Sequence, residues 1–298
     1  MKKYVSLDIG GTAIKYGLID ENGVILEKGS TATEAQKGGA AILKKAIDIV
    51  EAYRCTNEIS GICISSTGMV DPKRGEIIYA GPTVPNYKGT KLKESMENRF
   101  GVCCEVENDV NCANLAEFVS GASAGSKTSV MLTVGTGIGA SLIINGEIYN
   151  GWSNSACEVG YMHLGDGDFQ TLGAASVLTK KVAERKQEST DSWNGLRIFE
   201  EAQKGDAVCC QAIDEMADVL GKGIANICYV VNPQVVVLGG GIMAQEAFLK
   251  EKVETSVRRY LVPILAENTK ILFAKHKNDA GILGAFYHFC RCQKAEGE

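Results

Sequence analysis

The stretch Leu7-Asp8-Ile9-Gly10-Gly11-Thr12 is an apolar run that ends in a glycine turn, and Leu132-Thr133-Val134-Gly135-Thr136-Gly137 repeats this pattern in the second half of the chain. In each copy a second apolar run follows, from Tyr16 to Ile19 or from Ser141 to Ile144, and a polar turn with glycine comes next. This alternation predicts two glycine-broken β-hairpins. Because each half of the chain contains one copy, the sequence predicts two related domains.

Outside the hairpins, apolar residues alternate between strand spacing and helix spacing. We expect strands at 61–65, 102–106 and 235–238, and helices at 92–100, 110–120, 206–231, 241–260 and from 279 onward. Alternating strands and helices indicate α/β domains. We expect an N-terminal domain over 1–118 and a C-terminal domain over 119–283, with the last helix, about 284–298, packed back on the N-terminal domain.

The composition excludes several classes of protein. The chain has 298 residues with 31 Lys+Arg against 36 Asp+Glu, a net charge of -5, so it lacks the basic field that attracts nucleic acid or anionic lipid. No stretch approaches the roughly 18 uninterrupted apolar residues of a membrane span, and the first residues do not resemble a signal peptide. We therefore expect a cytoplasmic protein without nucleic-acid or membrane partners.

The eleven cysteines form no C-x-x-C pair, the spacing that zinc ribbons and redox dithiols use. Most lie within apolar runs, so we interpret them as reduced, buried thiols. Cys157 and His163 lie six residues apart, which matches no zinc spacing. We interpret His276 and His288 as a surface and a core histidine.

Three glycine-rich turns are candidates for binding a nucleotide. Turns such as Gly10-Gly11 and Gly135-Thr136-Gly137 present backbone N–H groups to phosphate oxygens without interfering side chains. One such turn could be a tight hairpin and nothing more, whereas two related turns favour nucleotide binding. A third, Gly239-Gly240-Gly241, joins a strand to a helix, where amides favour an anion or the close approach of adenosine. Neither the Walker sequence nor the dinucleotide-binding sequence G-x-G-x-x-G is present in its required context.

Two acidic residues follow expected strands. Asp8, beside the first glycine turn, could be a turn-capping residue, or it could hold Mg²⁺ through water next to a phosphate. Asn108 and Asp109 stand between a strand and a helix, where an N-cap explains one of the pair but not both. Phosphoryl transfer to a hydroxyl requires a carboxylate to accept the proton and a polar group to orient the acceptor, and these two residues suit the roles.

A third group of polar residues lies in the segment 157–163. Glu158 can accept hydrogen bonds from the hydroxyls of a sugar, and Tyr161 offers both an apolar face and a donor. A metal site is the alternative, but the spacing of the cysteine and histidine in this segment does not favour it. We therefore expect a hydroxyl-binding loop.

Taken together, these motifs resemble those of ROK-family sugar kinases over nearly the whole chain. The matching stretches, in order, are Asp8–Thr12, Glu107–Asn111, Gly135–Gly139, Glu158-x-Gly160, Leu238–Gly241 and Asp279–Ala285. The resemblance implies an actin-like (ribonuclease H-like) ATPase fold, with two α/β domains and a cleft between them. It also implies transfer of a phosphoryl group from ATP, with Mg²⁺, to a hexose hydroxyl, usually O6, by a homo-oligomer, which we expect to be a homodimer.

The resemblance assigns roles to individual positions. It implies that Asp109 is the catalytic base. It implies sugar contacts from Gly68 (through its backbone), Asn86, Asn108 and Glu158. It implies a phosphate and Mg²⁺ site at Asp8, Gly10, Gly11, Thr12, Thr136 and Gly137, and an adenosine site at Gly239 and Gly240.

The chain departs from the family's pattern at two places. Tyr161 stands where most members have histidine, and 165–172 contains no cysteine where most members have a zinc-binding segment. We therefore expect no zinc site. Gln170 occupies the place of a glutamate that binds the sugar near its anomeric end. This zinc-less pattern is similar to that of bacterial β-glucoside kinases and N-acetylmannosamine kinases, and the sequence leaves a β-glucoside, N-acetylmannosamine and glucose open as substrates.

Two alternatives to a kinase belong to other classes. One is a sugar-responsive transcriptional regulator, since the family contains such proteins with a helix-turn-helix domain ahead of the first hairpin. Here that hairpin begins at Leu7 and the charge is negative, which disfavours DNA binding. The other is a non-catalytic sugar-binding protein, which the presence of both Asp8 and Asp109 disfavours.

Overall fold

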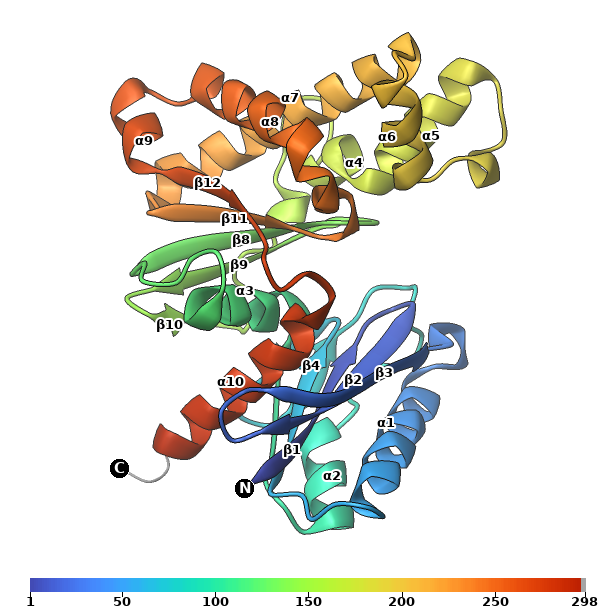
Figure 1. Ribbon diagram of the computed structural model, residues 1–298, viewed down its shortest axis with the longest axis vertical. Helices are drawn as coiled ribbons and strands as arrows, with labels where there is room; N and C mark the ends of the chain where they lie inside the picture. The colour runs from blue at the N-terminus through green and yellow to red at the C-terminus, as the bar shows by residue number, and fades with distance from the viewer. Residues whose placement is uncertain (296–298) are drawn as a thin grey trace. The chain divides into compact units, whose positions relative to one another are not determined.

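The computed structural model describes residues 1–295, and the chain forms two compact units (Figure 1). The first unit contains Met1–Val119, Asn150–Ala156 and the chain from Asn278 onward. The second contains Ser120–Tyr149 and Cys157–Lys277. The segment Asn150–Ala156 therefore belongs to the first unit although it lies within the sequence range 119–283.

A five-stranded mixed sheet forms the centre of the first unit. Its strands are β1 (Lys3–Ile9), β2 (Ala13–Asp20), β3 (Ile25–Ala32), β4 (Gly61–Ser66) and β7 (Cys104–Asn108), in the order β3-β2-β1-β4-β7. The predicted hairpin is confirmed, because β1 pairs antiparallel with β2. β4 runs parallel to β1, and β7 runs parallel to β4, so the last residues of all three strands meet at one edge of the sheet.

Helices cover this sheet because their apolar residues recur at helical spacing. The helices are α1 (Gly39–Arg54), α2 (Leu92–Phe100), α3 (Asp109–Ser120) and α10 (Ala280–Ala295); the unit also has the 3₁₀ turn η1 (Ala35–Lys37) and the small sheet of β5 (Met69–Asp71) and β6 (Glu76–Tyr79). In α1, Ile42, Ala46 and Val50 are four residues apart and fully buried. The predicted helix 92–100 coincides with α2.

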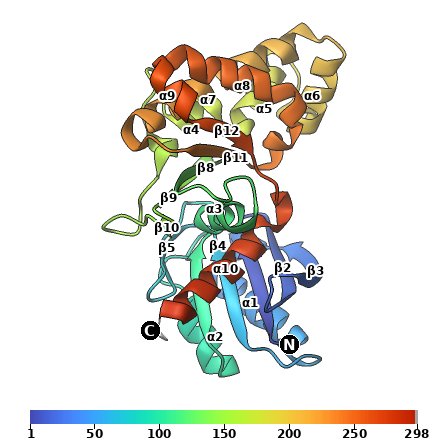
Figure 2. The same cartoon turned by 60° about the vertical axis from the view of Figure 1, so that its left-hand side comes forward.

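The last helix, α10, packs on the sheet of the first unit, as both ribbon views show (Figures 1 and 2). The ring of Tyr4 lies 5.3 Å from that of Phe286 and 5.4 Å from that of Phe289. In addition, the Ser6 hydroxyl donates a hydrogen bond to the Ile282 carbonyl at 2.7 Å. A side chain at Gly61 would clash with the Phe289 ring, so glycine there lets the helix approach β4 closely.

The second unit contains a sheet of the same topology. Its strands are β8 (Thr128–Val134), β9 (Ile138–Ile144), β10 (Glu147–Ile148), β11 (Val235–Gly239) and β12 (Lys270–Phe273), in the order β10-β9-β8-β11-β12. As in the first unit, a three-strand antiparallel meander is followed by two parallel strands. The internal repeat predicted from the two glycine-broken hairpins is thus a repeat of the fold.

The helices of the second unit follow its antiparallel meander in sequence, before and after β11. The helices are α4 (Phe169–Gly173), α5 (Ala175–Lys186), α6 (Gly195–Gln203), α7 (Ala207–Val231), α8 (Glu246–Tyr260) and α9 (Pro263–Asn268), with 3₁₀ turns η2 (Val159–Tyr161), η3 (Thr190–Ser192) and η4 (Gly241–Gln245); a further 3₁₀ turn, η5 (Lys277–Asp279), follows β12. The helix expected at 241–260 begins as a 3₁₀ turn. A Cβ at Gly221 would lie 2.1 Å from the Ser256 hydroxyl, which shows how closely α7 and α8 pack.

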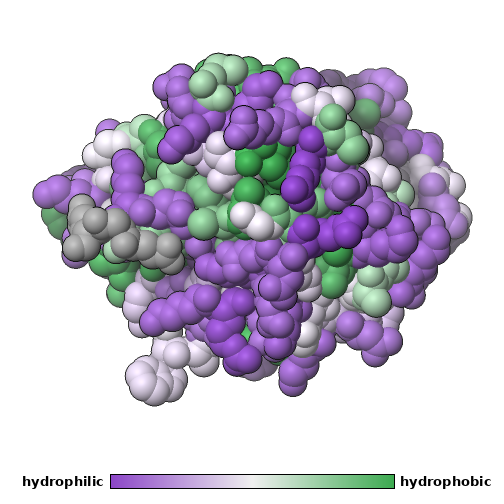
Figure 3. Space-filling model, turned by 90° about the horizontal axis from the view of Figure 1, so that it is seen from below, coloured by the Kyte–Doolittle hydropathy of each residue, from purple (hydrophilic) through white to green (hydrophobic). Residues whose placement is uncertain are grey.

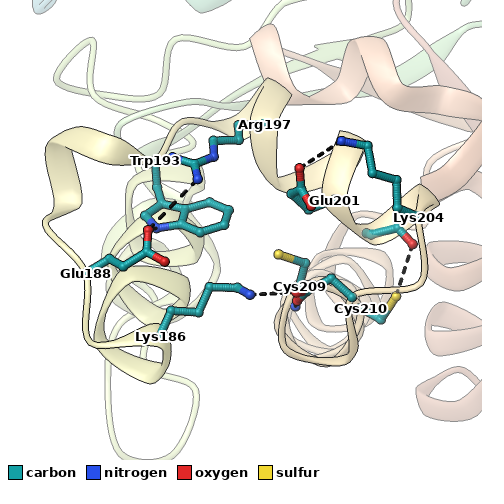
Figure 4. A network of polar contacts seen from close by, with 10 residues as sticks. Lys186, Glu188, Trp193, Arg197, Glu201, Lys204, Cys209 and Cys210 are labelled. Carbon is teal, nitrogen blue, oxygen red and sulfur yellow. Dashed lines mark hydrogen bonds and ion pairs between the residues drawn. The ribbon is translucent and has the colours of Figure 1, made fainter.

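A polar network joins α5, α6 and α7 at the beginning of α7 (Figure 4). Asp206 accepts a hydrogen bond from the Cys209 N–H at 2.9 Å and pairs with Lys186 at 2.6 Å, so it caps α7 and links it to α5. The Trp193 ring lies beneath the guanidinium of Arg197, 4.1 Å from the ring centroid. These contacts stabilise the helical layer, and we assign them no catalytic role.

No helix within residues 1–295 is both long and apolar enough to cross a membrane. On the face drawn in Figure 3, hydrophilic residues predominate and hydrophobic ones gather in small areas.

Candidate functional site

Asp8 lies near the end of β1 and is held by three neighbours. Ser65 and Lys15 stand beside it on the adjacent strands; the Ser65 hydroxyl donates to Oδ1 at 2.8 Å, and Lys15 Nζ lies 3.5 Å from Oδ2. At the start of α10, Gly281 packs against the carboxylate so closely that a Cβ there would lie 2.3 Å from Asp8 Cγ. The carboxylate is therefore fixed in position beside the glycine turn.

Asn108 and Asp109 stand where β7 ends and α3 begins. The Asn108 Oδ1 accepts hydrogen bonds from the backbone N–H groups of Val110 at 2.9 Å and Asn111 at 3.1 Å, which makes Asn108 the N-cap. Its Nδ2 donates to the Gly68 carbonyl at 2.9 Å and to Asp109 Oδ1 at 3.0 Å. The asparagine thus caps the helix and orients the aspartate at the same time.

The environment of Asp109 changes its acidity. Burial, followed by the nearby negative charge of Asp8, raises the pKa of Asp109 from its ordinary value of 3.8 to about 7. The Val110 N–H, which donates to Oδ1 at 2.9 Å, and Asn108 act in the opposite direction. A carboxylate with a pKa near neutrality can hold or release a proton under physiological conditions, as a general base must.

Beneath this pair lies Glu107, a residue to which the sequence analysis gave no role. Its side chain is buried and accepts hydrogen bonds from the Asn108 N–H at 2.7 Å, Asn111 Nδ2 at 3.1 Å and Asn150 Nδ2 at 3.5 Å. Burial raises the pKa of this carboxyl group. Glu107 therefore anchors both the start of α3 and the segment 150–156. The signal available from sequence was its position between the predicted strand 102–106 and the pair Asn108 and Asp109.

Gly68 and Asn86 are the other residues of the first unit that we expect near the sugar, and both lie in turns with a positive φ. Gly68 has a left-handed backbone with φ of 91°, and a Cβ there would lie 2.7 Å from the Tyr79 carbonyl. Its carbonyl accepts the hydrogen bond from Asn108 Nδ2. Asn86 is exposed and also has a positive φ, of 52°. Beside it, the buried Tyr87 exchanges a hydrogen bond with Ser66 at 2.8 Å, which holds this loop to the end of β4.

The first glycine turn leaves room for a ligand. Gly10 donates to the Ala13 carbonyl at 3.1 Å, and its own carbonyl accepts from the Thr33 hydroxyl at 2.6 Å, so the turn is fixed. A Cβ at Gly11 would meet no atom within 4 Å. Gly11 and Thr12 are exposed, so their polar groups are accessible to a phosphate.

The corresponding turn of the second unit is held by the beginning of α5. The Gly135 carbonyl accepts from the Ala175 N–H at 2.9 Å, and the Thr136 carbonyl accepts from the Ser176 hydroxyl at 2.7 Å. A Cβ at Gly135 would likewise meet nothing within 4 Å. The third turn is tighter, since Gly240 has φ of 98° and a Cβ there would lie 2.3 Å from the Val134 carbonyl; Gly239 is buried beside it.

Three predicted sugar contacts belong to the second unit. Glu158 precedes η2 and is exposed as a residue. The surrounding protein atoms nevertheless shield its carboxyl group partly from water, which raises the pKa of that group. Tyr161 is 56% exposed. Gln170, in α4, packs between two glycines: its Oε1 would lie 2.8 Å from a Cβ at Gly137 and 3.1 Å from one at Gly160. The Gln170 side chain therefore lies between the turn at Gly137 and the loop of Glu158.

The segment 165–172, where the resemblance implies the loss of a zinc site, is held by polar contacts. Asp168 and Thr171 form a capping box at the start of α4. His163 Nδ1 lies 3.1 Å from Asp168 Oδ1. These polar contacts hold the segment at the start of α4.

Comparison with known proteins identifies the class of protein. The model of the ROK family matches residues 4–291. The chain is 32% identical over 295 residues to a β-glucoside kinase of Listeria monocytogenes. This alignment covers 96% of this chain and 97% of the relative. The chain belongs to the ROK family.

Solved structures show the same fold. The Lmo2764 protein of Listeria monocytogenes, a suggested N-acetylmannosamine kinase, is 31% identical, with a TM-score of 0.88 and coverage of 98% of this chain and 99% of that one. A ROK family glucokinase of Streptomyces griseus, solved with glucose and AMPPNP, is 26% identical, with a TM-score of 0.84 and coverage of 95% and 97%. The actin-like fold predicted for this chain is thereby confirmed, and a ROK sugar kinase is the class that the relatives support.

Proposed function

We propose that the protein is an ATP-dependent hexose kinase that transfers the γ-phosphoryl group of ATP to a sugar hydroxyl, O6 by our expectation. The observation that carries this proposal is the arrangement at the start of α3. There Asp109, with its pKa raised to about 7, is held by the Nδ2 of Asn108 and by the Val110 N–H. Such a carboxylate suits proton removal from a hydroxyl at neutral pH.

In this mechanism the ionised Asp109 accepts the proton of the attacking hydroxyl. Asn108 keeps one face of the carboxylate oriented through Nδ2, and the Gly68 carbonyl fixes the asparagine in turn. Oδ1 of Asp109 accepts hydrogen bonds from Asn108 Nδ2 and from the Val110 N–H. We therefore assign the proton transfer to Oδ2. The carboxylate is thereby aligned before the sugar binds.

The residues around the first glycine turn fit a Mg²⁺-bound phosphate. Asp8 is a hard oxygen donor, which Mg²⁺ prefers, and Gly281 leaves its carboxylate room against α10. Gly11 and Thr12 would supply polar groups for phosphate oxygens in the first unit, and Thr136 and Gly137 would do so in the second. Gly10, whose N–H and carbonyl are bonded within the first unit, would hold the turn in place beside the phosphate. When bound, Mg²⁺ would neutralise phosphate charge. Gly239 and Gly240 would let adenosine approach the backbone.

The identity of the sugar is the finer part of the proposal. Among the proteins compared, one is a β-glucoside kinase, one a suggested N-acetylmannosamine kinase and one a glucokinase. We expect further contacts with the sugar from Asn86, Glu158 and Tyr161. Gln170 is neutral and both donates and accepts, so it should tolerate a substituent at C1 or C2 of the sugar. We propose that a β-glucoside or N-acetylmannosamine is a better substrate than glucose.

A coupled assay of ADP release tests this proposal with glucose, cellobiose and N-acetylmannosamine as acceptors. We expect turnover that requires Mg²⁺, with the highest kcat/KM for one of the two substituted sugars. The matched variant Gln170→Glu should shift the preference toward glucose. If glucose already has the highest kcat/KM in the unchanged protein, the specificity argument is wrong. If sugars bind but no ADP forms with any acceptor, the protein is a regulator or a binding protein instead.

A further inference from the structure

A buried carboxylate lies on the face of the first sheet that α10 covers. Glu105 is in β7, where its neighbours Cys104 and Val106 belong to the apolar core on the opposite face. It pairs in register with Cys63 of β4, and its side chain is 4% exposed. Strand residues that face a packed helix are usually apolar, so a glutamate at this position calls for a specific partner.

α10 presents two metal-ligating side chains to this carboxylate. His288 and Cys292 are four residues apart and therefore lie on the same face of the helix. The His288 Nε2 is 3.5 Å from the Cys292 Sγ. One ligand atom from each of Glu105, His288 and Cys292 lies within 4.8 Å of the other two. This is the one group of three or more such side chains found among residues 1–295.

We propose that Glu105, His288 and Cys292 form a binding site for a divalent cation of the Zn²⁺ class, which would clamp the last helix to β7. The donor set of one carboxylate oxygen, one imidazole nitrogen and one thiolate is characteristic of Zn²⁺. With Zn–S near 2.3 Å and Zn–N near 2.0–2.1 Å, a tetrahedral site places the sulfur and the nitrogen about 3.6 Å apart. The separation of Sγ and Nε2 matches this spacing.

The positive charge of Lys93 is the main objection to a cation here. Its Nζ lies 2.9 Å from both oxygens of Glu105. A carboxylate has about four lone-pair sites, so one oxygen can bind the cation while the other keeps the lysine. Outer hydrogen bonds of this kind commonly orient the ligands of a metal site. Cation binding requires the thiolate of Cys292, so the bound state releases one proton from that sulfur.

This proposal departs from the expectation that the chain has no zinc site. That expectation rested on the segment 165–172, which lacks cysteine and lies in the second unit. The cluster on β7 and α10 consists of other residues, and no feature of the kinase proposal depends on it.

Titration of the metal-free full chain with Co²⁺, a spectroscopic substitute for Zn²⁺, tests the site. Excess Mg²⁺ should be present so that the expected phosphate site does not take up Co²⁺. We expect one equivalent of Co²⁺ to bind with a near-ultraviolet thiolate-to-cobalt band and the intense visible bands of a tetrahedral ion. In the variant Cys292→Ser the thiolate band should vanish, and the affinity should fall at least about tenfold.

The matched control is Cys290→Ser, which removes a half-buried thiol two residues away on the same helix. It should keep both the band and the affinity. The variant Glu105→Gln should weaken binding but keep the thiolate band, and added Zn²⁺ should raise Tm in the unchanged protein but not in Cys292→Ser. Failure of the unchanged chain to bind one equivalent, or a thiolate band that survives Cys292→Ser or disappears in Cys290→Ser, would overturn the proposal.

Discussion

The two sheets share one strand order, but the ends of their strands differ in chemistry. In the first unit, Asp8 stands beside the glycine turn, and the end of β7 leads into Asn108 and Asp109. In the second unit, the residue corresponding to Asp8 is Thr133, and β12 ends at Phe273. Beside its glycine turn the second unit therefore offers neutral groups to a ligand, whereas the first unit carries a carboxylate there.

This difference indicates how two copies of one fold can serve different purposes, one for acid–base chemistry and one for binding a polyanion. Acid–base chemistry needs titratable groups whose pKa values are shifted by their surroundings, and the first unit has them in Glu107 and Asp109. Binding a polyanion requires amides and hydroxyls without negative charge, which the turn at Thr136 and Gly137 provides. Substitutions in each unit test that division.

The largest expected effect concerns the proposed base in the first unit. Replacing Asp109 by Asn keeps the size of the side chain but removes the proton acceptor, so turnover should fall about 10²- to 10⁴-fold. Sugar binding, measured by calorimetry, should be largely retained. Near-normal turnover in the purified variant would show that Asp109 is not the base.

The second effect concerns the packing of Asp8. In Gly281→Ala the new Cβ would lie 2.3 Å from Asp8 Cγ, so we expect a loss of stability of about 1–3 kcal/mol together with reduced turnover. In the second unit, Gly241→Ala meets no atom within 4 Å and should leave Tm nearly unchanged. Thermal unfolding of both variants measures the contrast, and equal Tm values would contradict the close packing at Asp8.

The smallest expected effect concerns the glycine turns, where the two units should behave alike. A Cβ at Gly11 or Gly135 meets no protein atom within 4 Å, so each alanine variant should fold with stability changed by no more than about 0.5 kcal/mol. The added methyl group would occupy space that a phosphate oxygen needs, and the KM for ATP should rise about fivefold or more. An unchanged KM in either variant would remove that turn from the phosphate site.

The sequence predicted the local features of the molecule well because local patterns determine them. Glycine turns between apolar runs predicted both hairpins, and the position of Asn108 and Asp109 between a strand and a helix predicted their place at the end of β7. Of the pair, Asn108 is the residue that caps the helix, and it also orients Asp109. Local spacing was sufficient for these conclusions.

Features that depend on packing between distant segments could not be predicted in this way. Gly281 meets Asp8 across more than 270 residues of chain, and Asn150 reaches Glu107 from a segment that lies between strands of the other unit in sequence. Likewise, the contact of Gln170 with the turn at Gly137 follows from how α4 packs. No periodicity in the sequence reports such contacts.

The dependence of kcat/KM on pH tests the central claim most directly. Because the pKa of Asp109 is raised to about 7, the fraction of ionised base falls as the pH drops through that value. We predict that kcat/KM decreases about tenfold per pH unit below pH 7, and that the residual activity of Asp109→Asn lacks this decrease. A flat profile from about pH 5 to 8 in the unchanged enzyme, or the same decrease in Asp109→Asn, would contradict the assignment of Asp109 as the catalytic base.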